Sequence, residues 1–102
     1  MSVPFNVLIS QEAQWDIEES YAFYEAAQQG LGEKFEEDLN TAFEAIADNP
    51  KICQLRYKRT IRIVFTKSFP FGIHYLIDGK EVKVIAVFHT SRSPKNWDNR
   101  IK

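Results

Sequence analysis

The residues best suited to chemistry lie where the last apolar segment of the chain ends. Residues 82–88 are strongly apolar, and the stretch after them carries His89, Arg92, Lys95 and Trp97. His89 can act as a general acid or base near neutral pH, or it can brace the loop by hydrogen bonding to backbone. Because a rigid sheet positions the mobile side chains at its strand ends, this outlet is suited to holding a charged partner.

Three arginines are expected to converge on this outlet. Arg59 and Arg62 come from the preceding sheet segment, and Arg92 comes from the outlet itself. Convergent guanidinium groups can hold a phosphate through paired hydrogen bonds or stabilise the charge of a phosphoryl transition state. Trp97 can stack on a base, fill an apolar pocket of a partner, or pack back on the sheet as the last apolar anchor.

Other kinds of site lack their signatures. The chain contains no glycine-rich phosphate loop, H-E-x-x-H, cysteine pair or G-x-S-x-G. His74, the only other histidine, falls in mid-strand and is predicted to be a sheet-face residue. Cys53 is the only cysteine, which excludes an internal disulfide and a cysteine cluster and indicates a buried or tolerated thiol. We therefore predict no metal and no cofactor.

The charges divide between the two halves of the chain. Residues 1–50 hold one basic and eleven acidic residues, a net charge of −10, whereas residues 51–102 hold twelve basic and three acidic residues, a net charge of +9. Such a division predicts a two-sided electrostatic body whose basic half faces nucleic acid, an acidic protein or a disordered acidic partner. The alternative is that the two halves neutralise each other across the fold.

The length and composition are typical of one small domain. With 102 residues, 44% of them hydrophobic and 14% aromatic, the chain predicts a single domain over residues 1–102 with one compact core. No apolar run approaches the roughly 20 residues that span a bilayer, and the N-terminus lacks the pattern of a signal peptide. A cytoplasmic location is therefore expected.

The first half of the chain predicts a strand followed by two helices. Val3–Ile9 alternates as a strand, and Gln11–Gln28 has helical spacing, with Ser10 as its N-cap and Gly30 as its end. Glu33–Asp48 is the second helix, antiparallel to the first and stopped by Asn49-Pro50. The acidic runs of both helices are interpreted as solvated faces, since nothing singles out a catalytic pair of carboxylates.

The second half predicts three strands: Arg56–Thr66, Phe71–Ile77 and Val82–His89, the last two joined by a two-residue turn at Asp78-Gly79. If the first of these is one strand, Arg56, Lys58 and Arg62 share the face opposite Arg59 and Ile61. In the last strand, regular alternation puts Val82, Val84, Ala86 and Phe88 opposite Lys83, Ile85, Val87 and His89. The predicted fold class is α+β, in the order β-α-α-β-β-β, with the helix pair on one face of an antiparallel sheet.

Two segments resemble a known family. Residues 69–75 (FPFGIHY) and 86–94 (AVFHTSRSP) look like the ParE/RelE superfamily of bacterial toxins from type II toxin–antitoxin pairs. The resemblance extends over nearly the whole chain, including Tyr21 and Tyr24 in the first helix. It implies a small toxin that is held neutral by a cognate antitoxin, whose acidic or amphipathic tail wraps around it.

The superfamily contains two target classes. RelE-like members cut messenger RNA in the ribosome, whereas ParE-like members, known from plasmid stabilisation, poison DNA gyrase. The chain retains Arg92 of the nuclease pattern but has Gly72 where that pattern has an arginine, and it has Trp97 near the position of the C-terminal tyrosine. Because losing a transition-state arginine typically costs several kcal/mol, the resemblance favours the ParE branch.

The resemblance leads to two main hypotheses. In the first, the chain inhibits growth by binding a replication target such as DNA gyrase, and the contact surface for target or antitoxin consists of Arg59, Arg62, His89, Arg92 and Trp97. In the second, it is a ribosome-dependent endoribonuclease in which His89 moves protons while Arg62 and Arg92 hold the scissile phosphate. A third alternative is a non-toxic relative that still binds its antitoxin.

Overall fold

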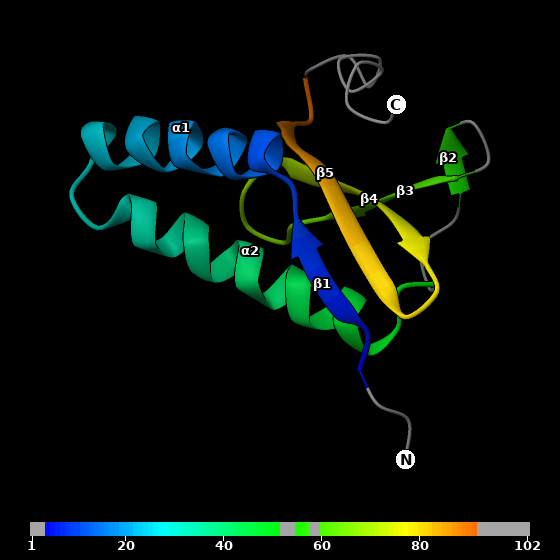
Figure 1. Cartoon of the computed structure of the whole chain (residues 1–102). Helices are drawn as coiled ribbons and strands as arrows, with labels where there is room; N and C mark the ends of the chain where they lie inside the picture. Colours follow the sequence, from blue (N-terminus) through cyan, green and yellow to red (C-terminus); the bar gives the residue numbers. More distant parts are fainter. Residues whose placement is uncertain (1–3, 52–54, 58–59, 92–102) are drawn as a thin grey trace.

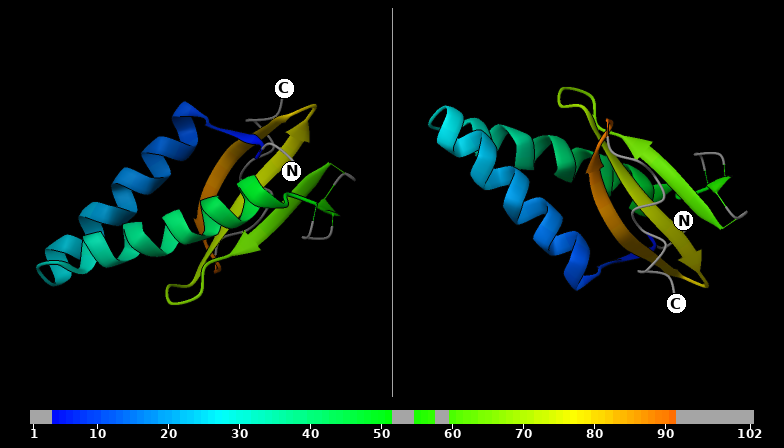
Figure 2. Two further views of the ribbon diagram at one scale, coloured as in Figure 1. Left: turned by 90° about the horizontal axis from the view of Figure 1, so that it is seen from below. Right: turned by 90° about the horizontal axis from the view of Figure 1, so that it is seen from above.

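The protein folds as two helices on one face of a twisted sheet (Figures 1 and 2). The computed structural model describes residues 4–51, 55–57 and 60–91. The elements follow the order β1 (Asn6–Ile9), α1 (Gln11–Ala27), α2 (Leu31–Asp48), β2 (Leu55–Tyr57), β3 (Ile61–Phe65), β4 (Phe71–Asp78) and β5 (Glu81–His89). The predicted α+β class and the position of the helix pair are confirmed. No helix in these ranges is long and apolar enough to cross a membrane.

The sheet is not purely antiparallel, which corrects the prediction. Its strand order is β1-β5-β4-β3-β2, and β1 pairs with β5 in parallel, from Asn6 opposite Glu81 to Ile9 opposite Val84. The other pairs are antiparallel. A parallel pair needs a long crossover connection, and here everything between β1 and β5 forms it. The strand that accepts β1 is decided by tertiary packing, so local sequence patterns do not reveal it.

The predicted strand over Arg56–Thr66 is in fact two strands. β2 and β3 pair antiparallel, with Leu55 opposite Arg62 and Tyr57 opposite Ile61, and a register shift lies between those pairs. Within β3 the expected alternation holds, because Ile61 belongs to the cluster on the outer sheet face while Val64 packs against the helix-facing core. Arg62 therefore occupies a helix-side position, where it is paired with Tyr75 of β4.

A bulge in β5 decides which side chains reach the helix side. His74 pairs with Ala86, but the next residue, Tyr75, pairs with Val84, so Ile85 is an extra residue. Ile85 and Ala86 consequently both belong to the outer cluster, whereas Val87 belongs to the helix-facing core. The regular alternation predicted for this strand is wrong from Ala86 onward, because it assumed one residue of β5 for each residue of β4.

The helix-facing core joins α2 to the middle of the sheet. Phe35, Leu39 and Ile46 of α2 are almost fully buried, and they pack with Ile73 and Tyr75 of β4. The Tyr75 hydroxyl donates a 2.7 Å hydrogen bond to the carbonyl oxygen of Pro50, which satisfies both buried groups. This core is the rigid base from which the end of β5 projects.

The outer face of the sheet carries a second, smaller cluster. Ile61, Ile85, Ala86 and Phe88 are buried there. His74 is also buried on this face, with its ring edge-on to that of Phe88 at 5.3 Å between centroids. The prediction that His74 is a sheet-face residue is therefore confirmed.

The helix N-cap and the hairpin turn lie at or next to the positions predicted from the sequence. The Ser10 hydroxyl accepts a 3.1 Å hydrogen bond from the Ala13 amide, as expected of the N-cap. The β4–β5 turn consists of Gly79 and Lys80, one residue later than predicted, because Asp78 still pairs with Glu81. Gly79 has a φ of 62°, which a glycine adopts without strain.

The start of α2 is capped from α1. The Glu25 carboxylate accepts hydrogen bonds from the Gly30 amide at 2.9 Å and from the Gly32 amide at 3.0 Å. These are orphan donors of a helix N-terminus, where a negative charge is also favourable. The cap allows α2 to begin at Leu31, two residues before the predicted start.

Replacing Glu25 with alanine should lower the free energy of unfolding by about 1–3 kcal/mol, because two partly buried amides lose a charged acceptor. Urea denaturation measures the change. Glu18, an exposed acid of the same helix, is the control, and Glu18→Ala should change stability by less than about 0.5 kcal/mol. Equal effects of the two substitutions would contradict the assigned role of the cap.

Candidate functional site

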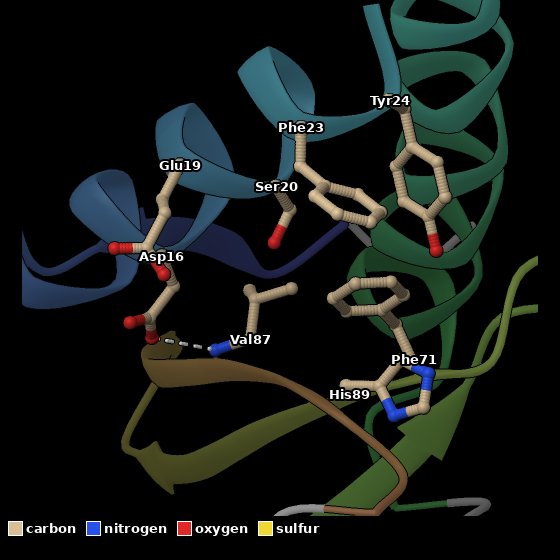
Figure 3. Close-up of a pocket in the computed structure, with 8 residues that line it drawn as sticks. All are labelled: Asp16, Glu19, Ser20, Phe23, Tyr24, Phe71, Val87 and His89. Atoms are coloured by element: carbon tan, nitrogen blue, oxygen red, sulfur yellow. Dashed lines mark hydrogen bonds between the residues drawn. The ribbon is translucent and has the colours of Figure 1, made fainter. Parts of the chain in front are cut away.

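A groove of about 240 Å³ lies between α1 and the C-terminal end of β5. Its lining side chains are either acidic, hydroxylic or apolar, with one imidazole (Figure 3): Asp16, Glu19, Ser20, Phe23, Tyr24, Phe71, Val87 and His89. The five residues from α1 are spaced at intervals of three, four, seven and eight, so they form one stripe along the helix. The remaining three come from the adjacent ends of β4 and β5.

The groove exists because β1 is shorter than β5. Pairing between them ends at Ile9, opposite Val84, and the Ser10 amide adds one hydrogen bond to the Val84 carbonyl at 3.0 Å. Beyond that point no residue of β1 pairs with β5, and α1 lies beside the strand instead. Asp16 takes over as the acceptor, because its carboxylate receives a 3.0 Å hydrogen bond from the Val87 amide.

Aromatic rings line the groove. The Phe23 and Tyr24 rings meet edge-to-face at 5.4 Å between centroids, and Tyr24 lies 6.1 Å from the Phe71 ring. Phe71 in turn meets the His89 ring edge-to-face at 5.5 Å. Phe23 remains 68% exposed, which is unusual for so large an apolar side chain in a small domain. Burial raises the pKa of the Tyr24 phenol, so its hydroxyl keeps its proton at neutral pH.

His89 braces the loop that follows β5. Its Nδ1 atom accepts a 3.1 Å hydrogen bond from the Ser91 amide and lies 2.8 Å from the Ser91 hydroxyl. Because Nδ1 accepts from an amide, the neutral ring carries its proton on Nε2. From the sequence, His89 was expected either to transfer protons or to brace the loop. Its hydrogen bonds with Ser91 support the bracing role.

The structure does not bring Arg62 and His89 together. Arg62 is paired with Tyr75 and His89 with Phe71, so they lie four residues of β4 apart, a separation of about 13 Å along the strand. They also belong to strands on opposite sides of β4. The other predicted site residues, Arg59, Arg92 and Trp97, lie outside the described residues, as does Cys53.

The acidic and aromatic stripe of α1 was missed by the sequence analysis. Asp16 and Glu19 were interpreted as part of a solvated face, and Phe23 was not assigned to any stripe. A signal was present, since adjacent residues such as Phe23 and Tyr24 point about 100° apart around a helix, so that the aromatic surface extends beyond the core-facing position of Tyr24. Within the described residues, no group of three or more histidine, cysteine or carboxylate side chains is placed to hold a metal.

Solved structures with the same fold define the class of protein. The chromosomal ParDE toxin–antitoxin system of P. aeruginosa contains a chain that is 15% identical, with a TM-score of 0.75 over 86% of this chain and 98% of that one. The toxin–antitoxin complex RelBE2 of Mycobacterium tuberculosis contains one that is 17% identical, with a TM-score of 0.61 over 87% of this chain and 94% of that one. At such identities the likeness concerns the fold, which is that of the RelE/ParE-like toxins.

The family model gives the particular assignment. Residues 7–94 match the model described as the ParE toxin of the type II toxin–antitoxin system parDE. The chain belongs to the ParE toxin family. A comparison with curated protein sequences found no match.

Proposed function

We propose that this protein inhibits growth by binding DNA gyrase in the cytoplasm and that a cognate antitoxin neutralises it. The observation that carries the proposal is the match of residues 7–94 to the ParE toxin model. The ParDE and RelBE2 structures, which are toxin–antitoxin complexes, support the antitoxin as the partner. The predicted contact surface, which is made of Arg59, Arg62, His89, Arg92 and Trp97, remains a proposal.

The arrangement of the described residues favours binding over RNA cleavage. An endoribonuclease needs its proton-transfer group and its phosphate-holding arginine around one scissile phosphate. His89 and Arg62 are separated by about 13 Å along the sheet, and the aromatic ring of Phe71 packs against His89. Gly72 stands where the nuclease pattern has an arginine, so this position supplies no positive charge at the start of β4. These positions support a toxin that works through its surface.

The proposal is tested by inducing the protein in a bacterial host and following labelled thymidine and labelled methionine over the first minutes. Thymidine incorporation should fall first, because gyrase inhibition stops replication before translation. Purified gyrase should then lose supercoiling activity when the protein is added. The Phe35→Ala variant, which is expected to misfold, serves as the inactive control.

An early fall in methionine incorporation would overturn the gyrase proposal and favour the endoribonuclease. In that case His89→Ala and Arg92→Ala should each reduce single-turnover RNA cleavage by orders of magnitude. If neither label is affected by the soluble, folded protein, then the chain is a non-toxic relative, and antitoxin binding is the part of the proposal left to test by co-purification.

A further inference from the structure

The groove between α1 and β5 has a chemistry opposite to that of the predicted basic contact surface. Asp16 and Glu19 lie on its helix side, and they belong to a helix that carries five acidic residues and no basic one. The neighbouring α2 carries six acidic residues and one lysine. The carboxylates of Asp16 and Glu19 therefore give the α1 side of the groove a negative potential.

Positive charge on the described part of β5 lies far from the groove. Lys83 is six residues before His89, about 20 Å along the strand, and its ammonium group is paired with Asp78 at 3.0 Å. Lys80 lies over the Phe5 ring at 4.9 Å. Among the described residues that line the groove, two are carboxylates and His89 is the one basic side chain, so a cation is the complementary occupant.

The apolar side chains of the groove further restrict the kind of cation that it can bind. Phe23, which is 68% exposed, offers aromatic surface to an aliphatic stem or to the face of a guanidinium group, and the buried Phe71 ring lies beneath the groove. The groove, at about 240 Å³, is smaller than the roughly 300–1,000 Å³ of small-molecule sites. It is open along α1, where Glu19 and Phe23 are exposed. This combination fits one long basic side chain that is presented by a peptide segment.

We propose that the groove between α1 and β5 binds an arginine or lysine side chain of the antitoxin, flanked there by apolar residues. The stem lies on the exposed ring of Phe23, and the cationic head pairs with Glu19 at the rim. Ser20 and the protonated Tyr24 hydroxyl offer further oxygen acceptors (Figure 3). This inference rests on the proposed function for the identity of the partner. It adds that the bound segment carries a basic residue at this point, whereas the family resemblance implied an acidic or amphipathic tail.

The test uses two five-residue probes, acetyl-Ala-Leu-Arg-Leu-Ala-amide and the same peptide with citrulline, which replaces the guanidinium by an uncharged group of the same shape. Each is titrated into the ¹⁵N-labelled protein, and the Val87 and His89 amide signals are followed. The arginine peptide should shift both signals saturably and bind about tenfold more tightly than the citrulline peptide, since it alone makes the ion pair and the cation–π contact.

Two variants assign the contact to the groove. Glu19→Gln should weaken binding of the arginine peptide about two- to fivefold, as expected for an exposed ion pair, and should leave the citrulline peptide unchanged. Phe23→Ser should weaken both peptides. Glu18→Gln removes a neighbouring exposed acid that does not line the groove, so it should change neither.

Equal affinity for the two peptides, an unchanged affinity of Glu19→Gln, or no saturable shift of Val87 and His89 would each overturn the inference. The outcome is independent of toxicity. A protein that inhibits growth but binds neither peptide retains the proposed function and loses this inference. A protein that binds the arginine peptide selectively without affecting growth retains the cation-binding groove and loses the gyrase proposal.

Discussion

Replacing Phe35 with alanine is expected to cost about 3–5 kcal/mol of folding free energy, the typical loss for a fully buried phenylalanine. Phe35 is completely buried. Its ring lies 4.8 Å from that of Phe71, 5.3 Å from that of Tyr24 and 5.6 Å from that of Phe69, measured between centroids. Because small domains have a total stability of roughly 5–15 kcal/mol, the variant should lose a large fraction of its stability.

Urea denaturation followed by circular dichroism measures the loss. Phe65 is the matched control because it is the same residue type but is 53% exposed, and Phe65→Ala should cost less than about 1 kcal/mol. Phe35→Leu separates packing from ring geometry: it should retain most of the stability while disturbing the Tyr24 and Phe71 side chains that line the groove. A Phe35→Ala variant as stable as Phe65→Ala would refute the assignment of the core.

The parts of the fold that local sequence determines were predicted correctly. Residues such as Leu39 and Ile46 recur at helical spacing, Ser10 supplies a cap, and Asn49-Pro50 cannot extend a helix. The helix pair, the two strands near Phe71–Ile77 and Val82–His89, and the α+β class follow from such signals. Part of the family resemblance, residues 71–75 and 86–89, lies within β4 and β5.

The parts that depend on distant contacts were not predictable. The bulge at Ile85 has no local signal, because Ile85, Ala86 and Val87 are all suited to either face of a buried strand. It nevertheless decides that Val87 lies on the helix side. The parallel pairing of β1 likewise depends on where the helix pair returns the chain. The groove is a product of both features, so its lining could not be assembled from sequence spacing.

The structure changes the meaning of the two-sided charge pattern. From the sequence, the basic half was expected to carry the function, and the acidic faces of the helices were expected to be solvated surface. Asp16 and Glu19 of α1 instead line a groove with exposed aromatic surface, and His89 of the basic half lines the same groove. A toxin that binds both a target and an antitoxin could use surfaces of opposite charge for the two partners. Salt dependence and charge-reversal substitutions would then distinguish the binding of one partner from that of the other.

Replacing Asp16 with alanine should have the second-largest effect, a loss of about 1.5–3 kcal/mol, which is the range for a hydrogen bond to a charged group. The Val87 amide donates to Asp16 at 3.0 Å across a sequence separation of 71 residues, so the bond fixes α1 to the end of β5. Without the Asp16 carboxylate, β5 loses the acceptor that stands where a neighbouring strand would supply one. The Val87 amide is then partly buried without this hydrogen bond.

Two measurements separate this local effect from a general loss of stability. Urea denaturation gives the free energy of unfolding, and hydrogen exchange at the Val87 amide reports local opening. Asp16→Asn keeps an oxygen acceptor, so its loss of stability should be at most half of that of Asp16→Ala. Glu18→Ala should change the stability hardly at all. If exchange at Val87 in Asp16→Ala were no faster than global unfolding allows, then the carboxylate would not be what holds α1 against β5, and the groove would need another explanation for its shape.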